Sequence, residues 1–306
     1  MRPPIPQRPS VRQLEYLVAV SESLHFRRAA EAQGVTQPAL SAQIQALEEL
    51  LGVQLFERTR RKVLPTAVGR AVATRARIVL QAIDALVETA RADTAPLAGP
   101  LRLGVIPTIA PYLLPRVLPG LRTEFPQMVL FLREEFTDLL LARLSSGELD
   151  VALLALPVDV AELGSLPLFN DDFRLAVPAN HRLAKKKRVS ERDLDGEEIL
   201  LLEDGHCLRT QALAVCSRAG AREATRVRAT SLGTLAQMVA GGLGVTLLPQ
   251  IAAAVEGRSA QGIVLLPFED PPPTRQVGLV WRRASARGAE FTRLGEHIVT
   301  LLDAVD

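Results

Sequence analysis

The pattern of apolar residues changes once along this chain, at residues 94–100, where Pro96, Gly99 and Pro100 predict a hinge. Before the hinge, apolar residues recur at helical spacing. After it, short apolar runs typical of strands alternate with helical segments, beginning with a strand at 101–106. A chain of 306 residues can form one to three domains. We therefore expect a helical N-terminal part and an α/β C-terminal part.

Two short helices joined by a turn are expected within residues 26–48, after a first helix at 11–21. The turn contains Gly34, and Thr36 is a suitable N-cap for the second of the pair. Such a pair is a helix-turn-helix, whose second helix can contact base edges in a major groove. The residues expected to bind DNA there are Thr36, Gln37, Pro38 and Ser41.

A basic hairpin is predicted at residues 55–65, as the wing of a winged helix-turn-helix. Its Arg58, Arg60 and Arg61 are expected to contact phosphates. Residues 1–80 carry 12 Lys and Arg against 6 Asp and Glu. The whole chain has a net charge of +2, so the residues after 80 carry a net negative charge. This asymmetry favours a polyanion such as double-stranded DNA as partner. The alternative is a small helical bundle with a solvated basic hairpin.

A long helix is predicted at residues 67–93, where apolar residues recur at alternating spacings of four and three. That spacing is typical of a coiled-coil seam, so we expect two chains to pair along it. The alternative is a single amphipathic helix that packs on its own domain. At about 40 Å, however, the helix is longer than so small a domain.

The C-terminal part is predicted to form two α/β lobes. Residues 101–155 read as βαβαβ, which indicates a mostly parallel sheet. A second set of strands and helices follows, with a late strand at 276–281 and a closing helix, so a cleft between two lobes is expected. The predicted domains are a winged helix-turn-helix (1–66), a dimerising linker helix (67–93), a hinge (94–100) and a regulatory domain (101–306), with lobe I at 101–166 and 268–306 and lobe II at 167–267.

The chain has two cysteines, Cys207 and Cys216, nine residues apart. In a helix this spacing separates them by about 13.5 Å and places them on opposite sides. A disulfide needs Cα atoms within about 7 Å, so bridging requires the segment to refold, as a redox switch does. The chain shows no signal peptide and no membrane-spanning run. We expect it in the cytoplasm, where thiols stay reduced.

Five segments resemble the LysR-type transcriptional regulators: 28–32 (RAAEA), 35–44 (VTQPALSAQI), 47–52 (LEELLG), 55–58 (LFER) and 66–69 (TAVG). The resemblance covers essentially the whole chain. It implies a winged helix followed by a two-lobed domain like the periplasmic binding proteins. It also implies a homodimer, and further a homotetramer, on promoter DNA, with RNA polymerase as a partner. Neither an enzyme activity, a cofactor nor a metal is implied.

Within that family, residues 205–209 (GHCLR), Cys216 and 228–232 (RATSL) are similar to members that sense hydrogen peroxide. This likeness implies that Cys207 reacts with peroxide, that Cys216 is the resolving thiol, and that oxidative-stress genes are controlled. It also implies a peroxide pocket formed by Thr108, Thr137, His206, Cys207 and Gln211.

The chemistry of such a site requires Cys207 as a thiolate, because the thiolate is the nucleophile. The helix start, Arg209 and His206 are expected to stabilise that anion. The hydroxyls of Thr108 and Thr137 are expected to stabilise the leaving oxygen. Attack on peroxide gives a sulfenic acid, which a second thiol can convert into a disulfide.

Two other functions fit parts of the sequence. A regulator of the same fold could bind a small metabolite between its lobes, with both cysteines incidental and Cys216 a buried small hydrophobe. That reading predicts a roomy polar cleft. A thiol peroxidase would use Cys207 but leaves residues 11–65 unexplained.

Overall fold

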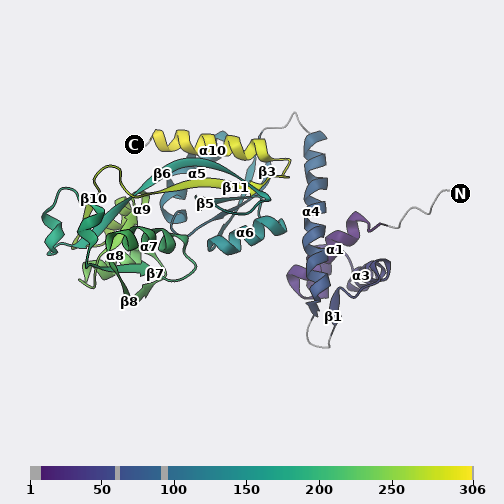
Figure 1. Ribbon diagram of the computed structural model, residues 1–306. Coiled ribbons are helices and arrows are strands. Elements are labelled where there is room, and N and C mark those ends of the chain that lie inside the picture. Colours follow the sequence, from purple (N-terminus) through teal and green to yellow (C-terminus); the bar gives the residue numbers. More distant parts are fainter. Residues whose placement is uncertain (1–7, 59–62, 91–95, 305–306) are drawn as a thin grey trace. The chain divides into compact units, whose positions relative to one another are not determined.

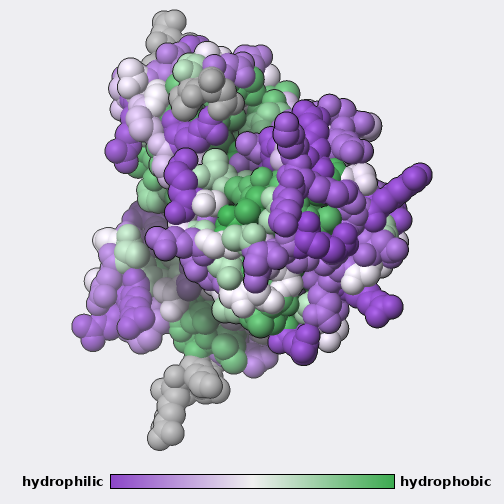
Figure 2. Space-filling view, turned by 90° about the vertical axis from the view of Figure 1, so that its left-hand side faces the viewer, coloured by the Kyte–Doolittle hydropathy of each residue, from purple (hydrophilic) through white to green (hydrophobic). Residues whose placement is uncertain are grey.

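The computed structural model describes residues 8–58, 63–90 and 96–304 (Figure 1). The chain forms two compact units, which divide near residue 93. The hinge at 94–100 and the domain bounds stay predictions. None of the helices among the described residues is long and apolar enough to cross a membrane. On the face shown in Figure 2, hydrophilic side chains predominate and separate smaller apolar areas.

The N-terminal unit contains the predicted helix-turn-helix. Helices α1 (Val11–Ser23), α2 (Phe26–Ala32) and α3 (Gln37–Leu51) precede a hairpin of β1 (Phe56–Arg58) and β2 (Val63–Pro65), which pair antiparallel. Helix α3 begins where the Thr36 side chain accepts a hydrogen bond from the Ala39 N–H, and it ends at Gly52 in the left-handed conformation. Its apolar face packs in the core of the unit through Leu40, Ile44 and Leu47.

Helix α4 (Ala67–Ala90) is the predicted linker helix, and residues 91–93 of that prediction lie outside the described residues. Ala73 and Ala76 are buried in the N-terminal core. The positions expected to form a seam are Val68, Val72, Val79, Ala82 and Leu86. Of these, Val72 is half-buried against the N-terminal core, whereas Val68 is 47%, Val79 45% and Leu86 70% exposed in the single chain. Pairing of two chains along this face stays a prediction, and the exposed apolar side chains favour it.

A seven-stranded sheet runs through the C-terminal unit in the order β10-β6-β11-β5-β3-β4, with β9 paired to β6. Strand β3 is parallel to β4 and β5, as predicted, but the other pairs are antiparallel. The sheet is therefore mixed. Strand β6 runs for 16 residues, and β11 pairs antiparallel along it. The strands are β3 (Gly99–Val105), β4 (Met128–Glu134), β5 (Val151–Leu156), β6 (Leu163–Pro178), β9 (Thr246–Pro249), β10 (Ile263–Pro267) and β11 (Thr274–Arg282).

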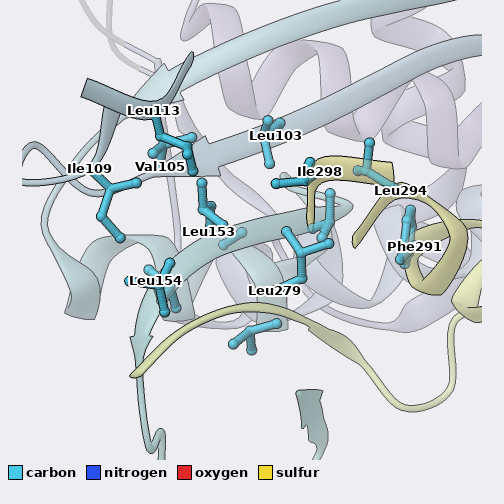
Figure 3. Packing of buried hydrophobic residues seen from close by; sticks show 14 of the residues in the cluster. Leu103, Val105, Ile109, Leu113, Leu153, Leu154, Leu279, Phe291, Leu294 and Ile298 are labelled. Carbon is cyan, nitrogen blue, oxygen red and sulfur yellow. The ribbon is translucent and has the colours of Figure 1, made fainter. Parts of the chain in front are cut away.

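Lobe I has its own apolar core between the sheet and three helices, α5 (Ala110–Glu124), α6 (Thr137–Ser146) and α10 (Gly288–Asp303). Figure 1 shows α10 and α6 on opposite sides of the sheet. In Figure 3, Leu103 and Leu153 from the strands pack toward Phe291, Leu294 and Ile298 of α10. The periodic apolar runs of strands and helices thus meet in one buried cluster.

Lobe II has a second core around the parallel pair β7 (Glu198–Leu202) and β8 (Arg222–Ala229). Helices α7 (Cys207–Ala219), α8 (Leu232–Ala240) and α9 (Gln250–Ser259) cover it, with short helices η1 (Arg182–Lys185) and η2 (Glu191–Leu194). The sequence did not predict α9 or β10, whose apolar runs are short. Gly241 ends α8, as expected for a helix C-cap.

Polar contacts join the lobes, and two of them connect the sheet and helices near the cores. In the sheet, the register of β6 and β11 pairs Asp171 with Arg275, and their fully buried side chains form an ion pair at 2.9 Å. The hydroxyl of Tyr112 on α5 donates to a carboxylate oxygen of Glu256 on α9 at 2.8 Å. The two cores therefore belong to one two-lobed unit, as the sequence predicted.

Candidate functional site

A tight turn after β7 presents Cys207 at the start of α7. Gly205 has a φ of +100°, and a Cβ added there would lie 3.2 Å from the ring of Phe136. The backbone conformation therefore favours glycine, and a Cβ would in addition press on the Phe136 ring. His206 is the N-cap residue and Cys207 the first residue of the helix, where backbone N–H groups favour an anion.

Cys207 lines a cleft of about 550 Å³ in the C-terminal unit. The walls come from the start of α6, the end of β5, the Gly205 turn, the first turns of α7 and the start of β11. Four of the five residues expected to form the peroxide pocket are brought together there: Thr137, His206, Cys207 and Gln211. The other lining residues are Asp138, Ala155, Leu156, Pro157, Val158, Gly205, Thr210, Thr274, Arg275 and Gln276.

Three polar atoms in the walls of this cleft are buried without a hydrogen-bond partner: Thr137 Oγ1, His206 Nε2 and Gln211 Oε1. Buried polar groups in folded proteins almost always have a partner. Both donors and acceptors are available among them. All three belong to residues that line the cleft together with Cys207, which suits a small polar molecule.

Thr108, the fifth expected pocket residue, is buried at 2% exposure and is not among the residues lining the cleft. Arg275 connects it to the cleft. Arg275 Nη1 donates to Thr108 Oγ1 at 2.9 Å, and Nη2 donates to the Thr108 carbonyl at 3.1 Å. Asp171 accepts from Arg275 and also from the Ile251 N–H at 3.1 Å. The sequence analysis missed Arg275 and Asp171, although a charged residue just before the apolar run 277–281 was a usable signal.

His206 is 5% exposed and its ring lies edge-on to Phe136, with centroids 4.6 Å apart. Burial lowers the pKa of His206, and this outweighs the opposite effects of Glu203 and of a hydrogen bond to the Thr230 backbone. The imidazole is therefore neutral near pH 7. Burial opposes a positive charge on His206, and the Nε2 atom of the neutral ring can accept a hydrogen bond when the other ring nitrogen donates to Thr230, so stabilisation of a Cys207 thiolate by His206 stays a prediction.

Arg209 was expected to stabilise a Cys207 thiolate by its charge. Instead its guanidinium binds two carboxylates, with Nε 2.9 Å from Asp204 Oδ1 and Nη2 2.9 Å from Glu223 Oε1. Its side chain is only 12% exposed. Two acidic partners offset its positive charge, so the helix start is the main feature left to stabilise an anion at Cys207.

Cys216 lies in the core of lobe II at 3% exposure. Burial raises the pKa of the Cys216 thiol to about 11, and Glu191 adds a smaller effect in the same direction. Both cysteines are free thiols, and α7 is continuous between them, so its rise separates them by about 13.5 Å. The geometry expected from the sequence is confirmed: no bridge can form while the helix is intact.

The expected DNA-binding residues of the N-terminal unit lie at the start of α3. Thr36, Gln37 and Pro38 are exposed and Ser41 is half-buried. Glu48 Oε1 accepts from the N–H groups of Leu55 and Phe56, at 2.8 and 3.2 Å, which attaches the hairpin to α3. Of the expected phosphate contacts, Arg58 ends β1, while Arg60 and Arg61 lie outside the described residues.

No group of three or more His, Cys, Asp or Glu side chains gathers as a metal site within residues 8–58, 63–90 and 96–304.

Comparison with known proteins identifies both units. Residues 11–70 match the family model of the bacterial regulatory helix-turn-helix protein, lysR family, and residues 94–303 match the LysR substrate binding domain. The DNA-binding transcriptional dual regulator OxyR of Escherichia coli is 47% identical over 294 residues, which cover 96% of each chain. A probable hydrogen peroxide-inducible genes activator of Mycobacterium leprae is 45% identical, over 96% of this chain and 94% of the relative.

Solved structures show the same likeness. A full-length OxyR variant from Pseudomonas aeruginosa aligns with a TM-score of 0.83 at 37% identity, and the match covers 95% of both chains. The reduced form of OxyR aligns with a TM-score of 0.62 at 43% identity, over 68% of this chain and 97% of that chain.

Proposed function

Since the chain belongs to the LysR family of bacterial transcriptional regulators, we propose that it senses hydrogen peroxide through Cys207 and regulates transcription of oxidative-stress genes. One observation carries the proposal. Cys207 stands at a helix start in a cleft where three buried polar atoms have no protein partner. The relatives named as hydrogen peroxide-inducible activators support the choice of signal.

The first step is attack of the Cys207 thiolate on one peroxide oxygen. A sulfur–oxygen bond forms, the O–O bond breaks, and the leaving oxygen takes a proton to become water. Cys207 becomes a sulfenic acid, oxidised by two electrons. We expect the Thr137 hydroxyl, which has no protein partner, to hydrogen-bond peroxide in the cleft, and Thr108 to act behind it through Arg275.

The second step joins Cys207 to Cys216 as a disulfide. Because α7 holds the two apart, its first turns must unwind. Leu208, Ala212 and Val215 are each less than 5% exposed and would leave the lobe II core. That loss costs several kcal/mol at about 1.5–3 kcal/mol per large aliphatic side chain. The surface around residues 205–230 must therefore repack, which gives the regulator two distinct states.

We propose that the output is a change in how paired subunits hold double-stranded promoter DNA. The exposed apolar side chains of α4 form the dimer seam, and further pairing gives a homotetramer. Thr36, Gln37, Pro38 and Ser41 contact bases, and Arg58, Arg60 and Arg61 contact phosphates. RNA polymerase is the partner at the promoter, and the cytoplasm is the compartment in which both thiols start reduced.

A second candidate is a LysR-family regulator that binds a small metabolite in the same cleft. The cleft volume of about 550 Å³ favours it, since pockets of that size hold small organic ligands. In that case the cysteines would be incidental. The two candidates differ in one respect: only the first requires a chemical change at Cys207.

The deciding experiment treats the full-length protein with a low dose of peroxide, traps free thiols, and identifies the modified cysteines by mass spectrometry. Transcription from a bound promoter is measured alongside, for the parent and for Cys207→Ser. We expect rapid loss of the Cys207 thiol, then a Cys207–Cys216 bridge, and no peroxide response in the variant. An undiminished response in Cys207→Ser would refute peroxide sensing and leave the metabolite candidate.

A further inference from the structure

Four charged side chains connect the first turn of α7 to the loop before it and to strand β8. Arg209 of α7 pairs with Glu223 of β8 and with Asp204 of the loop, both at 2.9 Å. Arg228 of β8 pairs with Asp204 at 3.0 Å and lies 3.9 Å from Glu223. We call Asp204, Arg209, Glu223 and Arg228 the α7 charge cluster.

The inner part of this cluster is shielded from water. The side chains of Arg209 and Glu223 are 12% and 23% exposed, whereas those of Arg228 and Asp204 are 45% and 81% exposed. Arg209 also donates to the Leu202 carbonyl at the end of β7, at 3.4 Å. Shielded ion pairs are screened less by salt than exposed ones. The Arg209–Glu223 pair is therefore the ion pair of the cluster that salt screens least.

The cluster lies where the proposed disulfide requires movement. Arg209 follows Cys207 by two residues, so it must move when Cys207 travels to Cys216. Formation of the sulfenic acid needs no such movement, because Cys207 already lines the cleft. The contacts of Arg209 are consequently intact in the reduced and sulfenic acid states and broken in the bridged state.

We propose that the α7 charge cluster sets the rate of the second oxidation step, the closure of the disulfide. This inference rests on the function proposed above. In that step the Cys216 sulfur displaces the oxygen of the Cys207 sulfenic acid. An S–S bond forms, the S–O bond breaks, and the hydroxyl leaves as water with the thiol proton. By holding the first turn of α7 in place, the cluster slows this closure.

The test uses Glu223→Gln and Asp204→Asn, which remove one negative charge each and keep a side chain of the same shape. Glu198→Gln is the matched control, since it breaks the exposed Arg226–Glu198 pair, 2.9 Å, on the same two strands but away from α7. Disulfide formation is followed at peroxide concentrations where its rate no longer rises with peroxide. Under that condition the second step alone limits the rate.

We expect Glu223→Gln to close the disulfide about tenfold faster than the parent, a factor equivalent to about 1.4 kcal/mol. Asp204→Asn, at an exposed position, should give a smaller acceleration, and Glu198→Gln should match the parent. Added salt should accelerate closure in the parent and less so in Glu223→Gln. Trapping of the sulfenic acid measures the first step separately in every variant.

Two outcomes would overturn the inference. Equal limiting rates for Glu223→Gln, Asp204→Asn and the parent would show that the cluster does not restrain closure. An equal acceleration in Glu198→Gln would show that any loss of charge on these strands has the same effect. Failure of the proposed function looks different, because then the parent itself would form neither a Cys207 sulfenic acid nor a disulfide with peroxide.

Discussion

The buried state of Cys216 predicts the order in which the two thiols react. In Cys207→Ser, Cys216 is the only thiol of the chain. Its pKa rises from the ordinary value of 9.0 to about 11 in the folded protein. At about pH 7 the thiolate fraction is then on the order of 10⁻⁴, about 100-fold below that of an exposed thiol. We expect Cys216 to be alkylated at least that much more slowly in the folded than in the unfolded chain.

The assay measures alkylation of Cys207→Ser by iodoacetamide, with the same variant unfolded in urea as its own reference. Between about pH 7 and 9.5, the rate in the folded protein should rise about tenfold per pH unit, because only the thiolate reacts. The unfolded reference should level off near pH 9. Folding stability should fall as the pH rises from about 9 to about 11. In that range the unfolded chain has lost the Cys216 proton, whereas the folded protein still holds it.

A folded rate within tenfold of the unfolded rate at about pH 7 would contradict this reasoning, as would a plateau below pH 9. Either result would mean that Cys216 is accessible as a thiolate without unwinding of α7. Cys216 could then compete with Cys207 for peroxide, and the assignment of a reacting and a resolving thiol would fail.

Four further outcomes follow from the contacts described above. Asp171→Asn should lower the free energy of unfolding by about 3–5 kcal/mol in urea titrations, because it leaves the Arg275 guanidinium buried without its ion pair; a loss under 1 kcal/mol would be incompatible with the buried contact. His206→Phe should reduce the loss of stability as the pH falls below about 6.5, because the lowered pKa of His206 means that the unfolded chain binds the extra proton; unchanged pH dependence in the variant would rule this out. Thr137→Val should slow Cys207 oxidation by roughly 10- to 100-fold without changing DNA affinity when reduced, and a parental rate would remove Thr137 from the site. Gln37→Ala should relax discrimination at one base pair of each half-site by about 1–3 kcal/mol, and equal weakening on specific and random DNA would misplace α3 in the groove.

Much of the fold could be predicted because local signals agree with tertiary structure. The Thr36 cap, the apolar stripe of α3 and the glycine after α8 each correspond to an observed helix end or buried face. The signals failed where pairing is non-local. Strand β6 is an example, because it runs for 16 residues from Leu163 while β11 pairs along it. No local pattern encodes that partner.

In the candidate site, too, residues close in sequence could be predicted and residues joined only by the fold could not. Its cysteine, histidine and glutamine follow one another in a single turn and helix, so sequence was enough to group them. Arg275 lies 167 residues from Thr108, and only the fold brings them within 2.9 Å. The electrostatics of His206 and Arg209 could not be predicted from the sequence either. Burial lowers the pKa of His206, and the partners Asp204 and Glu223 offset the charge of Arg209.

The register that pairs Asp171 with Arg275 has a consequence for how such regulators diversify. It places side by side the two points at which the chain enters and leaves lobe II. A segment whose ends are adjacent can be inserted or exchanged without disturbing the host. Residues 172–274, with the cysteine helix inside them, are thus a segment whose two ends are adjacent, as exchange between relatives requires. Recombination at these two neighbouring strands could exchange one input signal for another while the DNA-binding and dimerising parts stay unchanged.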